Sequence, residues 1–543
     1  MPQNYQLSQP SHYHINPSNY KETDAESAFV EKYVNIAEEL RQNPELNGEE
    51  HKTNGILVRE LKKFIPDFNI YTFGDVVGST NKSKYGIIAK IEGGKPSCTE
   101  HKKALILTAD MDALPNKTDI AINDASHNCG HNVNMAGLLA AAEKLAKNKD
   151  NLSGEIFIIF TPAEESGGGF GEMIDKGLFE NDKFGLQDYN PEDLSIITMH
   201  NNPMYEKGTI ASRVGAFLCG NNDFKIEITD NSDPKIDNNK EEFNNISLSI
   251  IGKGGHGGMP HEANTPILPM LNLVDVLKHN PKYKNIQINN LNTGTGAFNI
   301  IPTEAKISIS VPKSIDLNSL KDFLRNFCKT SSCEVNFTDC DDNDGKLSQN
   351  SIQAAKSVLS NLYNLVSKKT PAKSTNILSP TYASSNADGK IVIHGTSRFF
   401  ENEHAQALKD AISSTVSQAE YYGDGIRANV EFIQDSYPVT TNTEKFTKKL
   451  FDGLIKLKDT GVSYIKYVNT NADQIGGRDA FPFAFSKGKV KHSAYFFTGT
   501  KVNKNEVGLH NTSFVGKADI HIRTAVPAFL NMVETTLNAN NQA

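Results

Sequence analysis

The hydrophobic pattern of the N-terminal part of the chain alternates between helix-like and strand-like segments. Apolar positions recur with helical spacing from Ala28 to Arg41 and again over residues 136–148. Short continuous apolar runs fall at residues 86–93, 103–110, 154–162 and 194–200. Such runs are typical of strands buried on both faces, so the pattern predicts a largely parallel sheet covered by helices. In sheets of this kind, ligands bind at the carboxyl ends of the strands.

The pattern changes between about Val214 and Tyr437. Strand-like segments with alternating polar and apolar residues lie between helices, at residues 223–229, 246–252, 305–311, 390–398 and 428–433. We interpret residues 214–437 as an inserted α+β domain, because the segment is itself the size of a domain. Residues 1–213 and 438–543 would then form the two parts of one α/β domain. Residues 297–311 and 387–400 have similar patterns, so the insertion could contain two similar halves.

Composition and charge exclude several classes of protein. The chain has 543 residues, too many for one ordinary core, and a formal net charge of -8. This charge offers no basic surface for nucleic acid, and no apolar run is long enough to span a bilayer. Residues 1–20 lack the basic and apolar regions of a signal peptide, and six cysteines are too few for a disulfide framework. We therefore expect a cytoplasmic protein without nucleic-acid or membrane partners.

Residues that could bind metal ions gather in five short motifs, most of them at or just after predicted strands. The motifs are ADMDALP (109–115), SHNCGH (126–131), TPAEESGGG (161–169), TMH (198–200) and GLHNTSF (508–514). They contain Asp110, Asp112, His127, Cys129, His131, Glu164, Glu165, His200 and His510. A dinuclear metal site needs about five N, O or S ligands, one able to bridge both ions, and an open position for water. The motifs together satisfy that requirement.

Each of these residues also has an ordinary structural interpretation. A single histidine such as His200 at a strand end is more often a hydrogen-bonded structural residue, and Cys129 could be a small buried hydrophobe. Asp110 and Asp112 could cap a turn. The shared position at strand ends favours a metal site over these separate explanations. Adjacent carboxylates such as Glu164 and Glu165 point in different directions, so one could bind metal while the other takes a proton from water.

Four of the sequence patterns together resemble a known family. They are ADMDALP, Cys-Gly-His, PAEE followed by glycines, and GKGGHGGMPH (252–261). With them the chain resembles the aminoacylase/carboxypeptidase family of di-metal amidohydrolases (metallopeptidase family twenty), in the branch of hippurate hydrolase and auxin-conjugate amidohydrolases. The resemblance implies an α/β fold, a three-layer phosphorylase/hydrolase-like zinc-peptidase catalytic domain with an inserted α+β lid domain. It also implies that the enzyme hydrolyses N-acyl amino acids or short peptides with two divalent metal ions, zinc first, with manganese or cobalt as alternatives.

The resemblance assigns a role to each matching residue. It implies that Cys129 bridges the two metal ions and that His131, Glu165, His200 and His510 complete the ligand set. Glu164 would be the general base, and Asp112 would orient a ligand. In the lid, His256 would donate to the oxyanion of the tetrahedral intermediate. Asn299 and Arg398 would bind the substrate, with Arg398 holding its carboxylate in bidentate fashion; a further histidine, His261, would support the loop of His256.

Two departures from the family pattern leave alternatives open. The chain has Asn132 and Asn134 where the branch usually has Asp and His, which would weaken polarisation of the site or change the preferred metal. The inserted domain is about twice the usual size, like that of Xaa-His dipeptidases, where an enlarged lid can mimic the lid of a partner subunit. His256 could therefore act within a monomer or across a homodimer. The competing functions are an N-acyl amino acid hydrolase, a dipeptidase or carboxypeptidase, and a metal-binding protein without hydrolytic activity.

Overall fold

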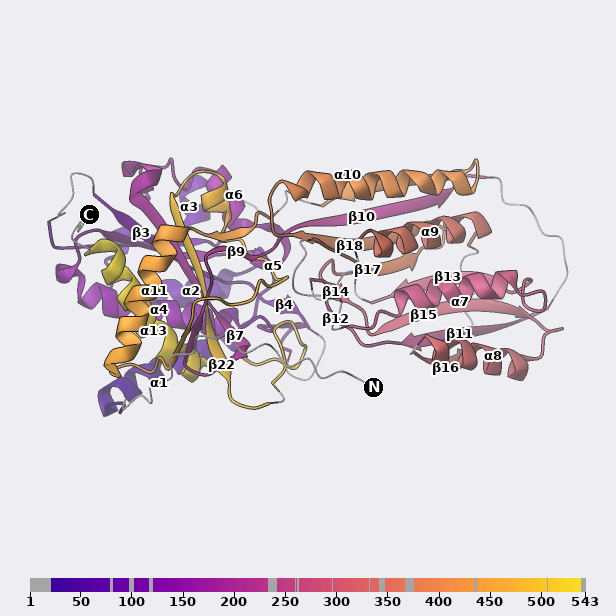
Figure 1. The fold of residues 1–543 in the computed structure, drawn as a ribbon, viewed down its shortest axis with the longest axis horizontal. Coiled ribbons are helices and arrows are strands. Elements are labelled where there is room, and N and C mark those ends of the chain that lie inside the picture. Colours follow the sequence, from indigo (N-terminus) through magenta and orange to yellow (C-terminus); the bar gives the residue numbers. More distant parts are fainter. Residues whose placement is uncertain are drawn as a thin grey trace. The chain divides into compact units, whose positions relative to one another are not determined.

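The chain folds into two compact units, each with a core of its own (Figure 1). The structure, a computed structural model, describes residues 21–78, 82–96, 102–116, 121–232, 242–258, 260, 263–294, 296–331, 333–340, 347–366, 376–433, 437–504 and 506–538. Unit 1 spans residues 1–218, 437–474 and 478–543, and unit 2 spans 219–436 and 475–477. Unit 1 is α/β and unit 2 is α+β, which confirms the predicted fold class. No helix of the described residues is long and apolar enough to cross a membrane.

Unit 1 is built on an eight-stranded sheet with the order β1-β2-β6-β3-β7-β22-β8-β21. The strands are β1 (Ile70–Thr72), β2 (Ile87–Glu92), β3 (Ala104–Asp110), β6 (Glu155–Thr161), β7 (Leu194–Glu206), β8 (Thr209–Ala211), β21 (Tyr467–Asn469) and β22 (His492–Lys501). The four central strands β6, β3, β7 and β22 are parallel, as the continuous apolar runs predicted. Short pairs β4 (Leu114–Pro115) with β5 (Ala125–Ser126), and β9 (Gly215–Leu218) with β20 (Thr440–Asn442), lie outside this sheet.

The sheet contains antiparallel pairs on both sides of its four central strands, so the prediction of a largely parallel sheet is wrong there, although the edge strand β21 pairs with β8 in parallel. Strand β2 runs antiparallel to both β6 and β1, and β8 runs antiparallel to β22. A parallel return needs a crossover connection of about a dozen residues or more, usually a helix. The described residues between β2 and β3 form no helix, so the chain enters β3 in the opposite direction. An apolar run alone cannot indicate strand direction.

Helices α1, α4, α11 and α13 pack together on the hydrophobic core of unit 1. The helices of this unit are α1 (Asp24–Arg41), α2 (His51–Leu61), α3 (Phe73–Val77), α4 (His131–Lys147), α5 (Glu164–Gly167), α6 (Gly169–Asp175), α11 (Glu444–Thr460), α12 (Phe483–Ser486) and α13 (Ala518–Leu537). Helix α1 begins four residues before the expected start at Ala28. Thr23 Oγ1 accepts from the Glu26 amide at 3.2 Å, and the Glu26 carboxylate accepts from the Thr23 amide at 2.9 Å. This capping box is a sequence signal that the apolar spacing does not include.

Unit 2 consists of two βαββαβ repeats that share one sheet. The first repeat comprises β11 (Phe243–Ile251), α7 (Ile267–His279), β13 (Gln287–Thr293), β15 (Glu304–Pro312), α8 (Leu317–Thr330) and β16 (Glu334–Asp339). The second comprises β10 (Gly220–Asp230), α9 (Gln349–Val366), β17 (Asn376–Ser385), β18 (Ile391–Phe399), α10 (His404–Ser417) and β19 (Ile426–Phe432). The sheet order β16-β11-β15-β13-β17-β18-β10-β19 places equivalent strands in mirrored positions. The repeats meet where Asn292 of β13 pairs with Ser384 of β17.

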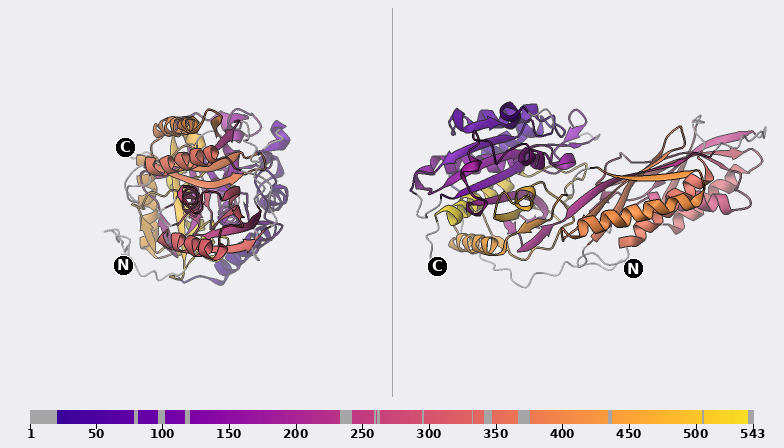
Figure 2. Two further views of the ribbon diagram at one scale, coloured as in Figure 1. Left: turned by 90° about the vertical axis from the view of Figure 1, so that its right-hand side faces the viewer. Right: turned by 90° about the horizontal axis from the view of Figure 1, so that it is seen from above.

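The helices of unit 2 cover one face of its sheet (Figure 2). Alternate residues of β10 and β18, such as Ile226 and Ile393, belong to the core beneath these helices. The intervening residues of the same strands therefore face away from the helices. A short hairpin-like pair, β12 (Gly255–His256) and β14 (Ile300–Ile301), also belongs to this unit.

Candidate metal centre

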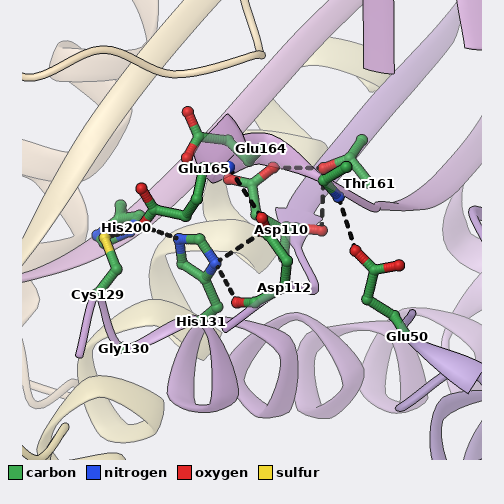
Figure 3. Close-up of polar contacts among 12 residues, drawn as sticks. Glu50, Asp110, Asp112, Cys129, Gly130, His131, Thr161, Glu164, Glu165 and His200 are labelled. Atoms are coloured by element: carbon green, nitrogen blue, oxygen red, sulfur yellow. Dashed lines mark hydrogen bonds and ion pairs between the residues drawn. The ribbon is translucent and has the colours of Figure 1, made fainter. Parts of the chain in front are cut away.

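The parallel strands of unit 1 bring three of the predicted motifs to one edge of the sheet. Asp110 is the last residue of β3, and Thr161 is the last residue of β6, directly across from it. His200 lies within the long strand β7, opposite Phe497 of β22. Because Thr108 of β3 pairs with Thr198 of β7, His200 lies at the level of Asp110. The ends of parallel strands meet here, as Figure 3 shows.

Cys129 is the centre of a compact cluster of potential metal ligands. Its Sγ lies 3.5 Å from His200 Nε2 and 3.3 Å from His510 Nε2. Glu165 Oε1 lies 3.3 Å from His510 Nε2 and 3.9 Å from His131 Nε2. Three overlapping groups each have their ligand atoms within 4.8 Å of one another: Cys129 with His131 and His200, Cys129 with Glu165 and His510, and His131 with Glu164 and Glu165.

The thiol is held in place by a glycine and two asparagines. Gly130 has φ +84°, and a Cβ there would lie 2.3 Å from Asn201 Nδ2. Asn201 Nδ2 donates to the carbonyl of Cys129 at 3.1 Å, and Asn134 Oδ1 accepts from the backbone and side-chain amides of Asn201. Asn132 instead donates to the carbonyl of Ala37 at 3.1 Å. The two asparagines that depart from the family pattern therefore bond to backbone and amide groups, and their described hydrogen bonds do not reach the ligand atoms.

A strained turn presents Glu164 and Glu165 at the end of β6. Ala163 has φ +52°, a conformation that is uncommon for a non-glycine residue. Its amide donates to the buried carboxylate of Glu50 at 2.9 Å. On the other side, Arg478 donates to the carbonyl of Glu165 at 2.6 Å and to that of Glu164 at 3.1 Å. Arg478 Nη1 also lies 3.6 Å from Glu164 Oε1, which orients that carboxylate.

Asp112 links the two sides of the cluster. His131 Nδ1 lies 2.8 Å from the carbonyl of Asp112 and 3.3 Å from its carboxylate, which leaves Nε2 of the imidazole turned toward Glu165. The other carboxylate oxygen of Asp112 accepts from the Glu165 amide at 2.9 Å. Such contacts fix the tautomer and orientation of a metal-binding histidine.

Two candidates from the sequence lie outside the cluster. Asp110 accepts a 2.5 Å hydrogen bond from Thr161 Oγ1, and it is absent from the three ligand groups. His127 is buried, and neither ring nitrogen has a hydrogen-bond partner among the described residues. Burial and the neighbouring His131 lower the pKa of His127 to about 3, which keeps it neutral. Neither residue is therefore placed as a ligand by the geometry.

The charged groups of the cluster shift the pKa values of its side chains in different directions. Burial by itself would raise the pKa of the Cys129 thiol, but the three imidazoles around it hold that pKa well below its ordinary value. Burial also disfavours the charged form of His510, yet Glu165 and Cys129 raise its pKa to about 10. Burial by itself would raise the pKa of Glu165, but His510 and His131 hold that pKa low. By contrast, burial and the neighbouring Glu165 raise the pKa of Glu164 well above its ordinary value. The cluster thus contains an anionic carboxylate beside a carboxyl that can carry a proton.

This donor set suits divalent metal ions. Thiolate, imidazole and carboxylate ligands are those that zinc, manganese and cobalt accept in proteins. Cys129 belongs to two of the three ligand groups, one with His131 and His200 and one with Glu165 and His510. The structure therefore supports a dinuclear site, and the ligand types alone do not select one metal.

Unit 2 places the other three predicted residues close together in the fold. Arg398 is fully buried in β18, and none of its guanidinium nitrogens has a hydrogen-bond partner among the described residues. The backbone of His256 pairs with Ile300, next to Asn299. Gly257 donates to the carbonyl of Asn299 at 2.7 Å. A Cβ on Gly257 would lie 3.0 Å from Thr396 Cγ2, two residues from Arg398, so the turn of His256 packs on β18. The side chain of His256 and all of His261 lie outside the described residues.

Glu50, Asn201, Arg478 and Tyr437 contribute to the site but were not predicted from sequence. Tyr437 Oη donates to the carbonyl of Glu164 at 2.7 Å, and the Arg478 guanidinium lies over its ring at 4.4 Å. These residues act on backbone groups of distant motifs, and such contacts leave no local pattern.

Most of the chain matches one known protein family. Residues 106–531 match the family model of peptidase family M20/M25/M40. The chain belongs to this family. Among the relatives in it, thermostable carboxypeptidase 2 of Saccharolobus solfataricus is 30% identical over 56% of this chain and 71% of the relative. Hippurate hydrolase of Campylobacter jejuni is 30% identical over 52% of this chain and 64% of the relative.

Solved structures of the family share the fold. A dinuclear metal-binding M20 peptidase of Bacillus subtilis, YXEP, has a TM-score of 0.55 at 18% identity, covering 95% of this chain and 100% of its own. An aminoacylhistidine dipeptidase of Vibrio alginolyticus has a TM-score of 0.50 at 12% identity, covering 95% of this chain and 97% of its own. The relatives of this M20 chain are enzymes that hydrolyse amide or peptide bonds, as the sequence motifs predicted.

Proposed function

We propose that this M20 protein hydrolyses the amide bond of N-acyl amino acids or short peptides next to a free carboxylate. The observation that carries the proposal is the Cys129 cluster with Glu164 at its edge. It combines one thiol, three imidazoles and two carboxylates whose pKa values are shifted in opposite directions. We assign Cys129, His131, Glu165, His200 and His510 as the metal ligands and Asp112 as the residue that orients His131. Two divalent ions bound there would supply Lewis acidity and lower the pKa of water; we propose zinc, with manganese or cobalt as alternatives.

Glu164 is placed to move the proton during the reaction. Burial and the neighbouring Glu165 raise its pKa well above that of an exposed glutamate, which suits a group that must both accept and donate a proton. As a base, its carboxylate takes a proton from the attacking water. The same carboxyl then protonates the leaving amine. Arg478 and Tyr437 hold the backbone of Glu164 for these two steps.

Unit 2 would bind the substrate through Arg398, Asn299 and His256. A buried guanidinium without partners is costly, so Arg398 calls for an anionic ligand group, and a carboxylate fits its two parallel N–H donors. We assign Asn299 to the substrate amide and His256 to the oxyanion of the tetrahedral intermediate. Their support is the backbone pairing that holds both residues beside β18.

A dipeptidase or carboxypeptidase activity is the second candidate. The observation that favours it is the doubled βαββαβ arrangement of unit 2. The large size of this inserted domain resembles that of Xaa-His dipeptidases. The remaining alternative, a metal-binding protein without activity, rested on Asn132 and Asn134. Their described hydrogen bonds go to backbone and amide groups away from Glu164, so they give no reason to expect a defective base.

Replacement of Glu164 tests the proposal directly. We expect Glu164→Gln to lower kcat by about a hundredfold to ten-thousandfold, because the proton transfers are lost. The variant should keep its metal content, measured by elemental analysis after reconstitution and desalting. The control Cys129→Ala should lose metal, since the bridging ligand is removed. The substrate panel should contain hippurate, acetyl amino acids and dipeptides including Xaa-His; substantial turnover by Glu164→Gln would rule out the assigned base.

A further inference from the structure

Two opposite charges that form no ion pair within the described residues lie on one face of the unit 2 sheet. We define the β10–β18 polar face by Asn221, Asp223, Thr396 and Arg398, which are all at most 4% exposed. Asn221 pairs with Arg398 across the two strands, and Asp223 pairs with Thr396. Paired residues of neighbouring strands point to the same side, so all four side chains face away from the helices. Asp223 and Arg398 are therefore diagonal neighbours.

Charges farther along the same face are paired with each other. Lys225 Nζ lies 2.7 Å from Glu227, and Lys390 Nζ lies 2.5 Å from the same carboxylate. Asp223 and Arg398 form no ion pair within the described residues. The carboxylate of Asp223 accepts one described hydrogen bond, from Asn221 Nδ2 at 2.9 Å. The unpaired charges are thus confined to the end of the sheet near the turn of His256.

Burying Arg398 without a described hydrogen-bond partner, and Asp223 without an opposite charge among the described residues, is unfavourable. An unpaired ion in a protein interior costs several kcal/mol, on the order of magnitude of the whole stability of a domain. Diagonal neighbours on a sheet are about 7–8 Å apart, which a long side chain such as arginine can span, yet no ion pair joins Asp223 and Arg398 within the described residues. Ser379 Oγ and Thr396 Oγ1, which lie on paired residues of β17 and β18, are also buried and have no hydrogen-bond partner in the described part of the chain. A ligand with an anionic and a cationic group would satisfy the whole set.

We propose that Asp223 selects substrates whose carboxyl-terminal residue carries a side-chain ammonium, such as lysine. The proposal rests on the proposed function, in which Arg398 binds the carboxylate of that residue. Asp223 then binds the ammonium, while Ser379 and Thr396 add donors to the carboxylate. The lysine ammonium is carried on a flexible four-carbon stem, which suits the separation of the two charges. The substrate class is therefore N-acyl or peptidyl derivatives of basic amino acids.

Two matched substrates test this selectivity. Benzoylglycyl-lysine and benzoylglycyl-norleucine have the same stem length and differ in the ammonium. We expect the wild-type enzyme to have a kcat/KM at least about tenfold higher for the lysine substrate. Asp223→Asn should bring the ratio of the two values close to one. The matched control Asp230→Asn makes the same change on the same strand, at a carboxylate that bonds Ser232, and should keep the wild-type ratio.

The test separates selectivity from two other outcomes. If Asp223 only balanced the charge of Arg398, Asp223→Asn would change both substrates by the same factor and leave the ratio unaltered, which would overturn the proposal. A wild-type ratio near one would also overturn it. If neither substrate is cleaved, the proposed function fails, and calorimetric titration of the full chain with free lysine and norleucine decides the binding preference. Equal affinities for the two amino acids would then exclude the role of Asp223.

Discussion

Glu50 shows how one buried side chain supports the turn that carries Glu164 and Glu165. Its carboxylate is fully buried and accepts from the amides of Gly48 and Ala163, each at 2.9 Å. Ala163 carries the positive φ that turns the chain into Glu164 and Glu165. Burial, followed by the charge of Asp112, raises the pKa of Glu50 from about 4.5 to about 8. The Glu50 carboxyl therefore stabilises the turn by accepting these two hydrogen bonds, whereas ionisation of the buried group opposes folding.

This shifted pKa predicts how stability depends on pH. Between about pH 4.5 and pH 8 the folded state retains a proton that the unfolded state has released, so the free energy of unfolding falls as pH rises. Glu50→Gln keeps an acceptor oxygen and cannot ionise. From pH 5 to pH 8 we expect the variant to gain at least about 1 kcal/mol relative to wild type, measured by denaturant unfolding of metal-free protein. The exposed control Glu49→Gln should show no such trend, and a pH-independent effect of Glu50→Gln would refute the explanation.

At the scale of elements, the start of α4 determines the position of the thiol. The helix begins at His131, directly after Gly130 in the left-handed conformation, so Cys129 lies just outside its first turn. Asn134 within the helix and Asn201 at β7 join this start to the sheet. The helix, the strand and the residues just before the helix thus place the sulfur atom beside His200 and His510.

Substitution of Gly130 should weaken metal binding in addition to lowering the stability of the fold. Gly130→Ala combines an unfavourable φ with a Cβ 2.3 Å from Asn201 Nδ2, whereas Gly177→Ala has a φ of +97° and no atom within 4 Å. Gly177→Ala should cost about 1–2 kcal/mol of unfolding free energy and leave metal affinity unchanged. We expect Gly130→Ala to weaken metal binding at least about tenfold in addition to its effect on unfolding. Equal metal affinities of the two variants, measured by titration, would contradict this role of Gly130.

At the scale of the whole molecule, the chain forms two units, and each has its own hydrophobic core and its own set of buried charged groups. The metal cluster belongs to unit 1, and the β10–β18 polar face belongs to unit 2. Each unit has its own hydrophobic cluster, so the chain should not unfold as a single two-state system. The effect of a ligand on the stability of each unit can therefore be measured separately.

Calorimetry of the full chain should resolve this division. We expect two unfolding transitions, of which zinc raises only the one that belongs to unit 1, because only the folded cluster binds the metal. At a free zinc concentration of about 100 Kd the added stability is about 2.7 kcal/mol. Cys129→Ala should abolish the shift and leave the other transition unchanged. A single transition that moves as a whole with zinc would show that the units unfold together.

Much of the candidate metal site was predictable because several of its residues follow parallel strands. Asp112, Glu165 and His200 are far apart in the sequence, but each is at or near the end of a strand that the apolar runs indicate. The direction of β2 was not predictable, because an apolar run has no direction. Glu50 and Arg478 were not predictable either, since they bond to backbone atoms of remote turns and any suitable donor or acceptor could occupy their positions.

The sequence by itself determined the α/β and α+β regions, the family and the chemical types of the ligands, because these depend on local spacing and on motifs. Only the tertiary structure decided which candidates come together. It placed Cys129 between His200 and His510, left Asp110 and His127 outside the cluster, and brought Asp223 to the diagonal of Arg398. The physical reason is that strand register and buried charge are properties of pairs of segments. A single segment does not contain the partner that determines either one.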